Sequence, residues 1–168
     1  MSDPVQLRPQ PRILEGDAAE RVARALPHNV EVEQALLGAL LRRPIEAYDA
    51  IASTGLEPAH FYGPEHFAIF DVIQRRIDRG RAVTPEAIFP AIEGEGGLGE
   101  LGLDYLHELQ DCIVTLINVG DYATTLIDLW RRRELILRLR ETTDQLYDLS
   151  DLDATAAQIG EQASDAAA

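Results

Sequence analysis

The sequence predicts an all-α protein in which a compact head of several helices is followed by a long helical hairpin. Apolar residues recur at the three- and four-residue spacing of one buried helix face, as in the run Val32, Ala35, Leu36, Ala39 and Leu40. No segment alternates convincingly between apolar and polar residues, as a half-buried strand would. Hydrophobic residues make up 46% of the chain, which is enough for a core.

Three segments are expected along the 168 residues. Residues 1–26 contain three prolines and a weak apolar pattern, so we expect a flexible N-terminal arm. Residues 27–117 are predicted to form the head. Residues 118–168 are predicted to form the hairpin, because a short connection joins its two helices and favours an antiparallel pair.

The first helix of the head has clear start and stop signals. Asn29 is a suitable N-cap for a helix that begins at Val30. Glu31 and Glu33 then lie in the first turn, where the helix dipole favours acidic side chains. Pro44 ends this helix, because proline cannot continue the hydrogen-bond ladder.

The next two helices are marked by glycine and proline. A short helix is expected over 45–53, closed by Gly55. The following helix begins at Pro64, a favoured first position, and stops at Gly80. Its predicted buried stripe consists of Phe67, Phe70, Ile73 and Ile77.

Four further segments complete the pattern. The Thr-Pro-Glu sequence at 84–86 predicts the start of a helix that runs to about residue 93. A glycine-rich loop follows and leads to a helix over about 104–114. A long helix, capped by either Asn118 or Asp121, should run to about residue 149. An alanine-rich helix is expected over 153–168.

The composition excludes several kinds of chemistry. All 15 basic residues are arginine, so the chain has no Walker A lysine for a nucleotide and no lysine for covalent catalysis. The single cysteine, Cys112, excludes an intrachain disulfide and a multi-cysteine metal site. We find no catalytic constellation. We therefore expect no enzymatic activity, no cofactor and no metal in this chain.

Charge and hydropathy bear on partners and location. The net charge of −14 argues against general nucleic-acid binding, because phosphate contacts need a basic surface. No apolar run reaches the roughly 18 residues of a membrane span, and the N-terminus lacks the apolar core of a signal peptide. A cytoplasmic location is expected.

Two apparent motifs are better explained structurally. Residues 94–99 match G-x-G-x-x-G, but a helix rather than a strand precedes them, so a loop is the better interpretation. His60, Glu65 and His66 do not have the spacing of a helical zinc motif, and capping or packing roles are expected for them.

The long helix contains a dense basic cluster. On a helix, three consecutive arginines spread over about 200°, so at least one must turn toward other protein and pair with an acid or an aromatic ring. The cluster is either a solvated, salt-bridged face or a patch that faces a partner or DNA. It consists of Arg131, Arg132, Arg133, Arg138 and Arg140.

Apolar residues lie on more than one side of the same helix. A helix that packs on one neighbour needs a single stripe, so this distribution indicates several neighbours. Either intrachain packing or a second subunit covers them, and we favour symmetric self-association. The predicted self-association residues are Tyr122, Leu126, Leu129, Trp130, Leu135, Leu139 and Leu146.

Four sequence blocks then resemble a known family. Residues 27–41 (PHNVEVEQALLGALL) closely resemble the opening helix of the N-terminal domain of the bacterial replicative DNA helicase DnaB. The blocks 61–70, 98–109 and 118–136 match in the same order. The resemblance extends over about 27–166.

The resemblance implies a non-catalytic module for oligomerisation and for docking of a primase or a loader. In that family, hairpins pair subunits, and a trimer of dimers forms a collar on the hexameric helicase of the replisome. The implied partners are a second copy of the chain and the C-terminal domain of a DnaG-type primase, and a helicase loader is a further candidate. Direct DNA binding should be weak or absent. The alternative is a stand-alone regulator that binds helicase or primase without a motor.

Three departures from the family pattern stand out. Residues 114–118 (VTLIN) lack the proline of the usual turn before the hairpin, and 42–44 (RRP) differ from its acidic turn. No RecA-like motor sequence is present, so ATP and Mg²⁺ are expected only in an attached motor domain. The second hairpin arm is expected to end before the linker to such a motor, which in the parent would be an ATP-dependent 5′–3′ DNA helicase.

Overall fold

The computed structural model describes residues 25–94, 101–112 and 118–147, together with residues 158, 160, 161 and 164. These described ranges contain helices and no strand, as the sequence predicts. The helices of the head, in chain order, are α2 (Val30–Arg42), α3 (Pro44–Ile51), the 3₁₀-helix η1 (Pro58–His60), α4 (Pro64–Asp78), α5 (Pro85–Gly94) and α6 (Gly102–Asp111). The long helix α7 (Val119–Tyr147) follows.

The predicted helix boundaries agree closely with those observed. The side chain of Asn29 accepts a hydrogen bond from the backbone N–H of Val32, so it caps α2 as expected. Helix α4 begins at Pro64, and Gly80 follows its end with a φ of +61°, a conformation that glycine adopts at little cost. Helix α6 starts at Gly102, two residues earlier than predicted, and ends at Asp111, three residues earlier.

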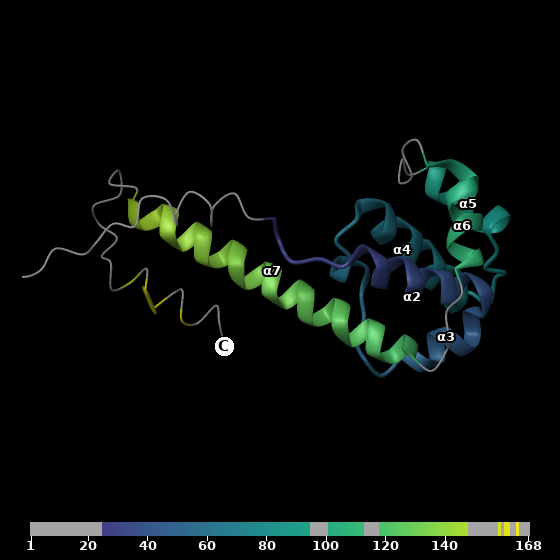
Figure 1. The fold of residues 1–168 in the computed structure, drawn as a ribbon, viewed down its shortest axis with the longest axis horizontal. Coiled ribbons are helices and arrows are strands. Elements are labelled where there is room, and N and C mark those ends of the chain that lie inside the picture. The colour runs from purple at the N-terminus through teal and green to yellow at the C-terminus, as the bar shows by residue number, and fades with distance from the viewer. Residues whose placement is uncertain are drawn as a thin grey trace, which may run out of the picture.

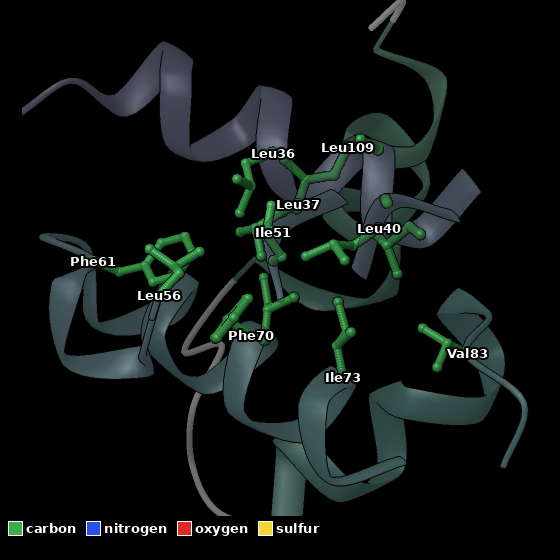
Figure 2. Packing of buried hydrophobic residues seen from close by; sticks show 14 of the residues in the cluster. Leu36, Leu37, Leu40, Ile51, Leu56, Phe61, Phe70, Ile73, Val83 and Leu109 are labelled. Carbon is green, nitrogen blue, oxygen red and sulfur yellow. The ribbon is translucent and has the colours of Figure 1, made fainter. Parts of the chain in front are cut away.

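Helix α2 lies at the centre of the head and packs against α3, α4, α6 and α7. Leu36, Leu37 and Leu40 from α2 are fully buried and belong to one hydrophobic cluster with Phe70 and Ile73 from α4 (Figure 2). These contacts explain the apolar spacing of α2, because its buried side faces several helices at once.

Helices α2 and α6 approach each other very closely. A Cβ atom on Gly38 would collide with the backbone carbonyl oxygen of Leu109. Glycine is therefore required at position 38 by packing rather than by backbone conformation.

One predicted core residue is exposed. Phe67 is 45% exposed, whereas its neighbours Ile69 and Phe70 are fully buried. The buried side of α4 passes through His66, Phe70 and Ile73, so the predicted stripe was wrong at Phe67. The cause is the buried contact that His66 makes with α2.

Helix α7 joins the head only through its first half. Val119, Ala123, Leu126 and Ile127 are buried in the common core. The second half of α7 extends beyond the head (Figure 1). The predicted antiparallel return of a second arm falls on a segment of which the structure describes only isolated residues, so the hairpin pairing lies outside the described part.

Candidate functional site

The projecting half of α7 presents an exposed leucine stripe, which we define as Leu135, Leu139 and Leu146. These side chains are 44%, 52% and 48% exposed. At about 100° per residue they fall within an arc of about 40° on the helix. Their spacing of four and seven residues is that of a helix-pairing seam. Large apolar side chains aligned in this way mark a surface that suits another protein.

The other predicted self-association residues lie at the head. Leu126 is 1% exposed and belongs to the intrachain core, so its assignment to a surface interface is corrected. Tyr122 is partly buried and packs against the same core. Leu129 and Trp130 are half-buried, and the Trp130 ring meets the His60 ring edge-on with centroids 4.6 Å apart. The four residues of the first half of α7 thus differ in environment from the leucine stripe.

Arg133 joins α7 to the head. It is buried, and its guanidinium donates hydrogen bonds to the carbonyl oxygens of His60 (2.8 Å) and Pro27 (3.2 Å). The same group lies 5.6 Å from the centroid of the Tyr62 ring, a cation–π distance. Burial lowers the pKa of Arg133, and the charge of Glu33 opposes this shift. The prediction that one arginine of the triplet turns inward is confirmed.

The remaining arginines of the cluster do not form one patch with Arg133. Arg132 makes an exposed ion pair with Asp128 one turn earlier, at 2.7 Å. Arg131 and Arg138 are exposed, and Arg140 is half-buried. Arg133 is therefore removed from the predicted partner-facing or DNA-facing patch, because its guanidinium is used inside the chain.

A buried polar network centres on Glu33, which is fully buried in α2. Its carboxylate accepts hydrogen bonds from the backbone N–H groups of Tyr62 (2.7 Å) and Gly63 (3.3 Å). It also accepts one from Nδ1 of His66, at 2.6 Å. A carboxylate loses its hydration on burial, and these three donors compensate for that loss.

The network continues from α4 to α6. The hydroxyl of Tyr105 donates to Nε2 of His66 (2.6 Å) and accepts from the side-chain amide of Gln34 (3.1 Å). Burial raises the pKa of Tyr105. In the described part of the chain, no buried side-chain polar atom lacks a hydrogen-bond partner. The network thus fixes α2, α4, α6 and the loop before α4 in one arrangement.

The histidines have the structural roles that the sequence predicts. Nδ1 of His60 accepts a hydrogen bond from the backbone N–H of Glu57 at 2.9 Å and so caps η1. His66 belongs to the network around Glu33. Within the described ranges, no group of three His, Cys, Asp or Glu residues is arranged to hold a metal ion.

Acidification is expected to destabilise the protein through His60. Burial lowers the pKa of His60 below its ordinary value of 6.5, and a protonated ring could not accept the hydrogen bond from Glu57. Unfolding therefore takes up a proton just below pH 6.5, and the free energy of unfolding falls there with a slope of at most about 1.4 kcal/mol per pH unit. Urea unfolding at pH 7.5 and 5.5 measures this loss.

The control is His60→Asn, which keeps an acceptor for the N–H of Glu57 but does not titrate. We expect this variant to lose less stability between the two pH values than the unaltered chain. Equal losses would show that His60 does not contribute to the pH dependence.

Sequence reasoning missed the burial of Glu33, which was assigned only to the first turn of the helix, where the dipole favours acids. A signal for it exists. Leu36, Leu37 and Leu40 lie three, four and seven residues after Glu33, so the carboxylate belongs to the buried face of α2.

The predicted loop over the G-x-G-x-x-G match at 94–99 lies outside the described residues, except for its first residue, Gly94.

Comparisons with known proteins agree with the sequence resemblance. A family profile described as DnaB-like helicase N terminal domain matches residues 25–128. A replicative DNA helicase DnaB from Rickettsia prowazekii (strain Madrid E) is 33% identical over 147 residues. That match covers 82% of this chain and 28% of the relative, so the chain spans less than a third of its length. One from Geobacillus stearothermophilus is 37% identical over 101 residues, covering 60% of this chain and 22% of that protein.

Solved structures share the fold. The crystal structure of the N-terminal domain of DnaB helicase from Mycobacterium tuberculosis matches with a TM-score of 0.73 and 24% identity, covering 85% of this chain and 98% of that one. A DnaB-like replicative helicase, described together with its interactions with primase, matches with a TM-score of 0.61 and 22% identity. This second match covers 82% of this chain and 30% of the other. No helix in the described part of the chain is long and apolar enough to cross a membrane.

Proposed function

The chain belongs to the family of DnaB-like helicase N-terminal domains, and we propose that it is a non-catalytic assembly and primase-docking module of a replicative helicase. One observation carries the assembly role: the exposed leucine stripe lies on a helix that leaves its own head (Figure 1). Covering such a stripe with the same stripe of a second copy gives a symmetric, self-complementary contact.

The docking role is supported by the structural neighbour described with its interactions with primase. Paired helices leave grooves that accept a partner helix. The proposed partners are a second copy, the C-terminal domain of a DnaG-type primase, and a helicase loader. ATP hydrolysis and DNA unwinding would belong to a motor domain of the parent helicase in the replisome.

Light scattering across a concentration series tests the assembly role. We expect a dimer or a hexamer at micromolar concentration. A monomer at all concentrations would contradict it. Adding the C-terminal domain of the cognate primase tests docking separately, and we expect the complex to gain mass. If the protein assembles but does not bind this domain, the docking role is contradicted and the assembly role is unaffected.

Leu139→Asp is expected to reduce self-association by at least tenfold, because a charge in the leucine stripe would have to be buried in the interface. The head should remain folded, since Leu139 is exposed in the single chain. Dissociation constants from sedimentation equilibrium measure the change.

Gln145→Asp is the matched control. Gln145 is exposed on the same half of α7, lies about 80° or more outside the leucine stripe, and gains the same charge. An equal loss of self-association in both variants would show that charge, and not the stripe, determines assembly.

A further inference from the structure

A second concentration of positive charge lies far from the arginine cluster of α7. Four of the 15 arginines fall within the seven residues from Arg75 to Arg81, with the sequence RRIDRGR. Asp78 is the one acidic residue of that stretch. The whole chain has a net charge of −14, so this stretch is a region of positive charge on an acidic protein. We call Arg76, Arg79 and Arg81 the basic turn.

The end of α4 brings these three residues together. The backbone N–H of Arg81 donates to the carbonyl oxygen of Arg76 at 2.8 Å, and the N–H of Gly80 donates to Ile77 at 2.9 Å. This is the pattern of a glycine-capped helix end, in which the chain folds back over the last turn. Arg79 lies three residues after Arg76 and is its neighbour on the helix. The cap therefore brings together the backbones of three arginines that an extended chain would separate.

The contacts within the turn leave positive charge available. Arg76 uses Nε to donate to the carbonyl oxygen of Ala82 at 2.7 Å, which fixes the turn and leaves its two terminal nitrogens for other partners. Arg79 and Arg81 are exposed. The structure gives neither of them a side-chain partner within the described residues. Asp78 lies exposed within the same stretch and offsets one of its four positive charges, so the stretch keeps a net positive charge.

The helix end tolerates these charges. The negative end of the helix dipole favours cations there, and this offsets the repulsion of a few tenths of a kcal/mol between like charges one turn apart. Arg76 lies in the last turn of α4, and Arg79 and Arg81 follow it as exposed residues. The positive charge of the basic turn therefore faces solvent, where a partner of opposite charge can reach it.

We propose that the basic turn is a docking site for a short acidic segment of a partner protein. Guanidinium groups bind carboxylates through paired hydrogen bonds. Three acidic residues of an extended peptide span about 10 Å, which suits three arginines on one turn. A long polyanion such as a DNA strand would also meet the acidic remainder of the chain, whose repulsion extends over about 10 Å at 0.1 M salt. A short acidic peptide avoids that repulsion.

The test is a titration of the protein into a fluorescein-labelled peptide of eight glutamates, followed by anisotropy at about 50 mM salt, where such contacts are little screened. We expect saturable binding that weakens at least tenfold in the double variant Arg79→Glu/Arg81→Glu. The neutral variant Arg79→Gln/Arg81→Gln should show a smaller loss in the same direction and fold like the unaltered chain by circular dichroism.

The control is Arg42→Glu/Arg43→Glu, which makes the same charge change at two exposed arginines of another helix end. Arg42 is the last residue of α2 and Arg43 is its C-cap, so both lie outside the basic turn. Their replacement should leave the affinity within twofold. An equal loss in both charge-reversed variants, or no saturable binding to the unaltered chain, would overturn the proposal. So would tighter, turn-dependent binding of a 15-nucleotide oligo(dT), which would assign the surface to nucleic acid.

Discussion

Replacing Glu33 with alanine is expected to lower the free energy of unfolding by about 3 kcal/mol or more, because each buried donor left without a partner costs about 1–3 kcal/mol. The substitution removes the acceptor of three hydrogen bonds at once. The N–H groups of Tyr62 and Gly63 and the imidazole of His66 would lose their buried partner. Unsatisfied buried donors account for most of the expected loss. Urea unfolding followed by circular dichroism gives the magnitude.

Glu31→Ala provides the matched control. Glu31 lies in the same first turn of α2 but is exposed. Its replacement should change the free energy of unfolding by no more than about 0.5 kcal/mol, as is usual for surface positions. If the two variants were equally stable, Glu33 would contribute only through the helix dipole, and the network would not hold the head together.

Leu126→Asp is expected to lower the free energy of unfolding by more than about 4 kcal/mol, because it places a charge in a closed core. Leu126 is 1% exposed and lies on the half of α7 that packs on the head with Val119 and Ala123. Natural domains are stable by about 5–15 kcal/mol, so this change should unfold much of the protein. Circular dichroism should show lost helix, together with a broadened or absent melting transition.

The comparison with Leu139→Asp makes this prediction specific. Both variants put the same charge on the same helix, thirteen residues apart. We expect the first to unfold the head and the second to leave the single chain folded while weakening its self-association. A folded Leu126→Asp protein of reduced mass would restore Leu126 to the interface and contradict the packing of α7.

Helix boundaries could be predicted because their signals are local. Asn29 caps α2 through its own side chain, and Pro64 and Gly80 bound α4 through backbone geometry. Each of these effects acts within a few residues, so a single sequence contains it. The inward turn of one residue of the arginine triplet was predictable for the same reason, since helix geometry alone excludes a shared face.

The environment of individual side chains was less predictable. Phe67 belongs to an apolar stripe by spacing, yet it is exposed because His66 takes the inward position. Leu126 and Leu139 are both apolar residues of one helix. Leu126 is buried because the head packs against that part of α7, and Leu139 is exposed because it lies beyond the head. Periodicity states that a face is apolar, but it does not state what covers that face.

The sequence by itself determined the all-α class, the order and approximate bounds of the helices of the head, the absence of a Walker A lysine and the family. Local propensity, capping and composition suffice for these properties. Tertiary structure alone decided that Glu33 is a buried acceptor, that Arg133 joins α7 to the head, and that the leucine stripe begins where the head ends. These properties depend on contacts between residues up to 106 positions apart. The free energy of these contacts comes from desolvation and hydrogen bonding in the folded core. A local sequence pattern does not contain that information.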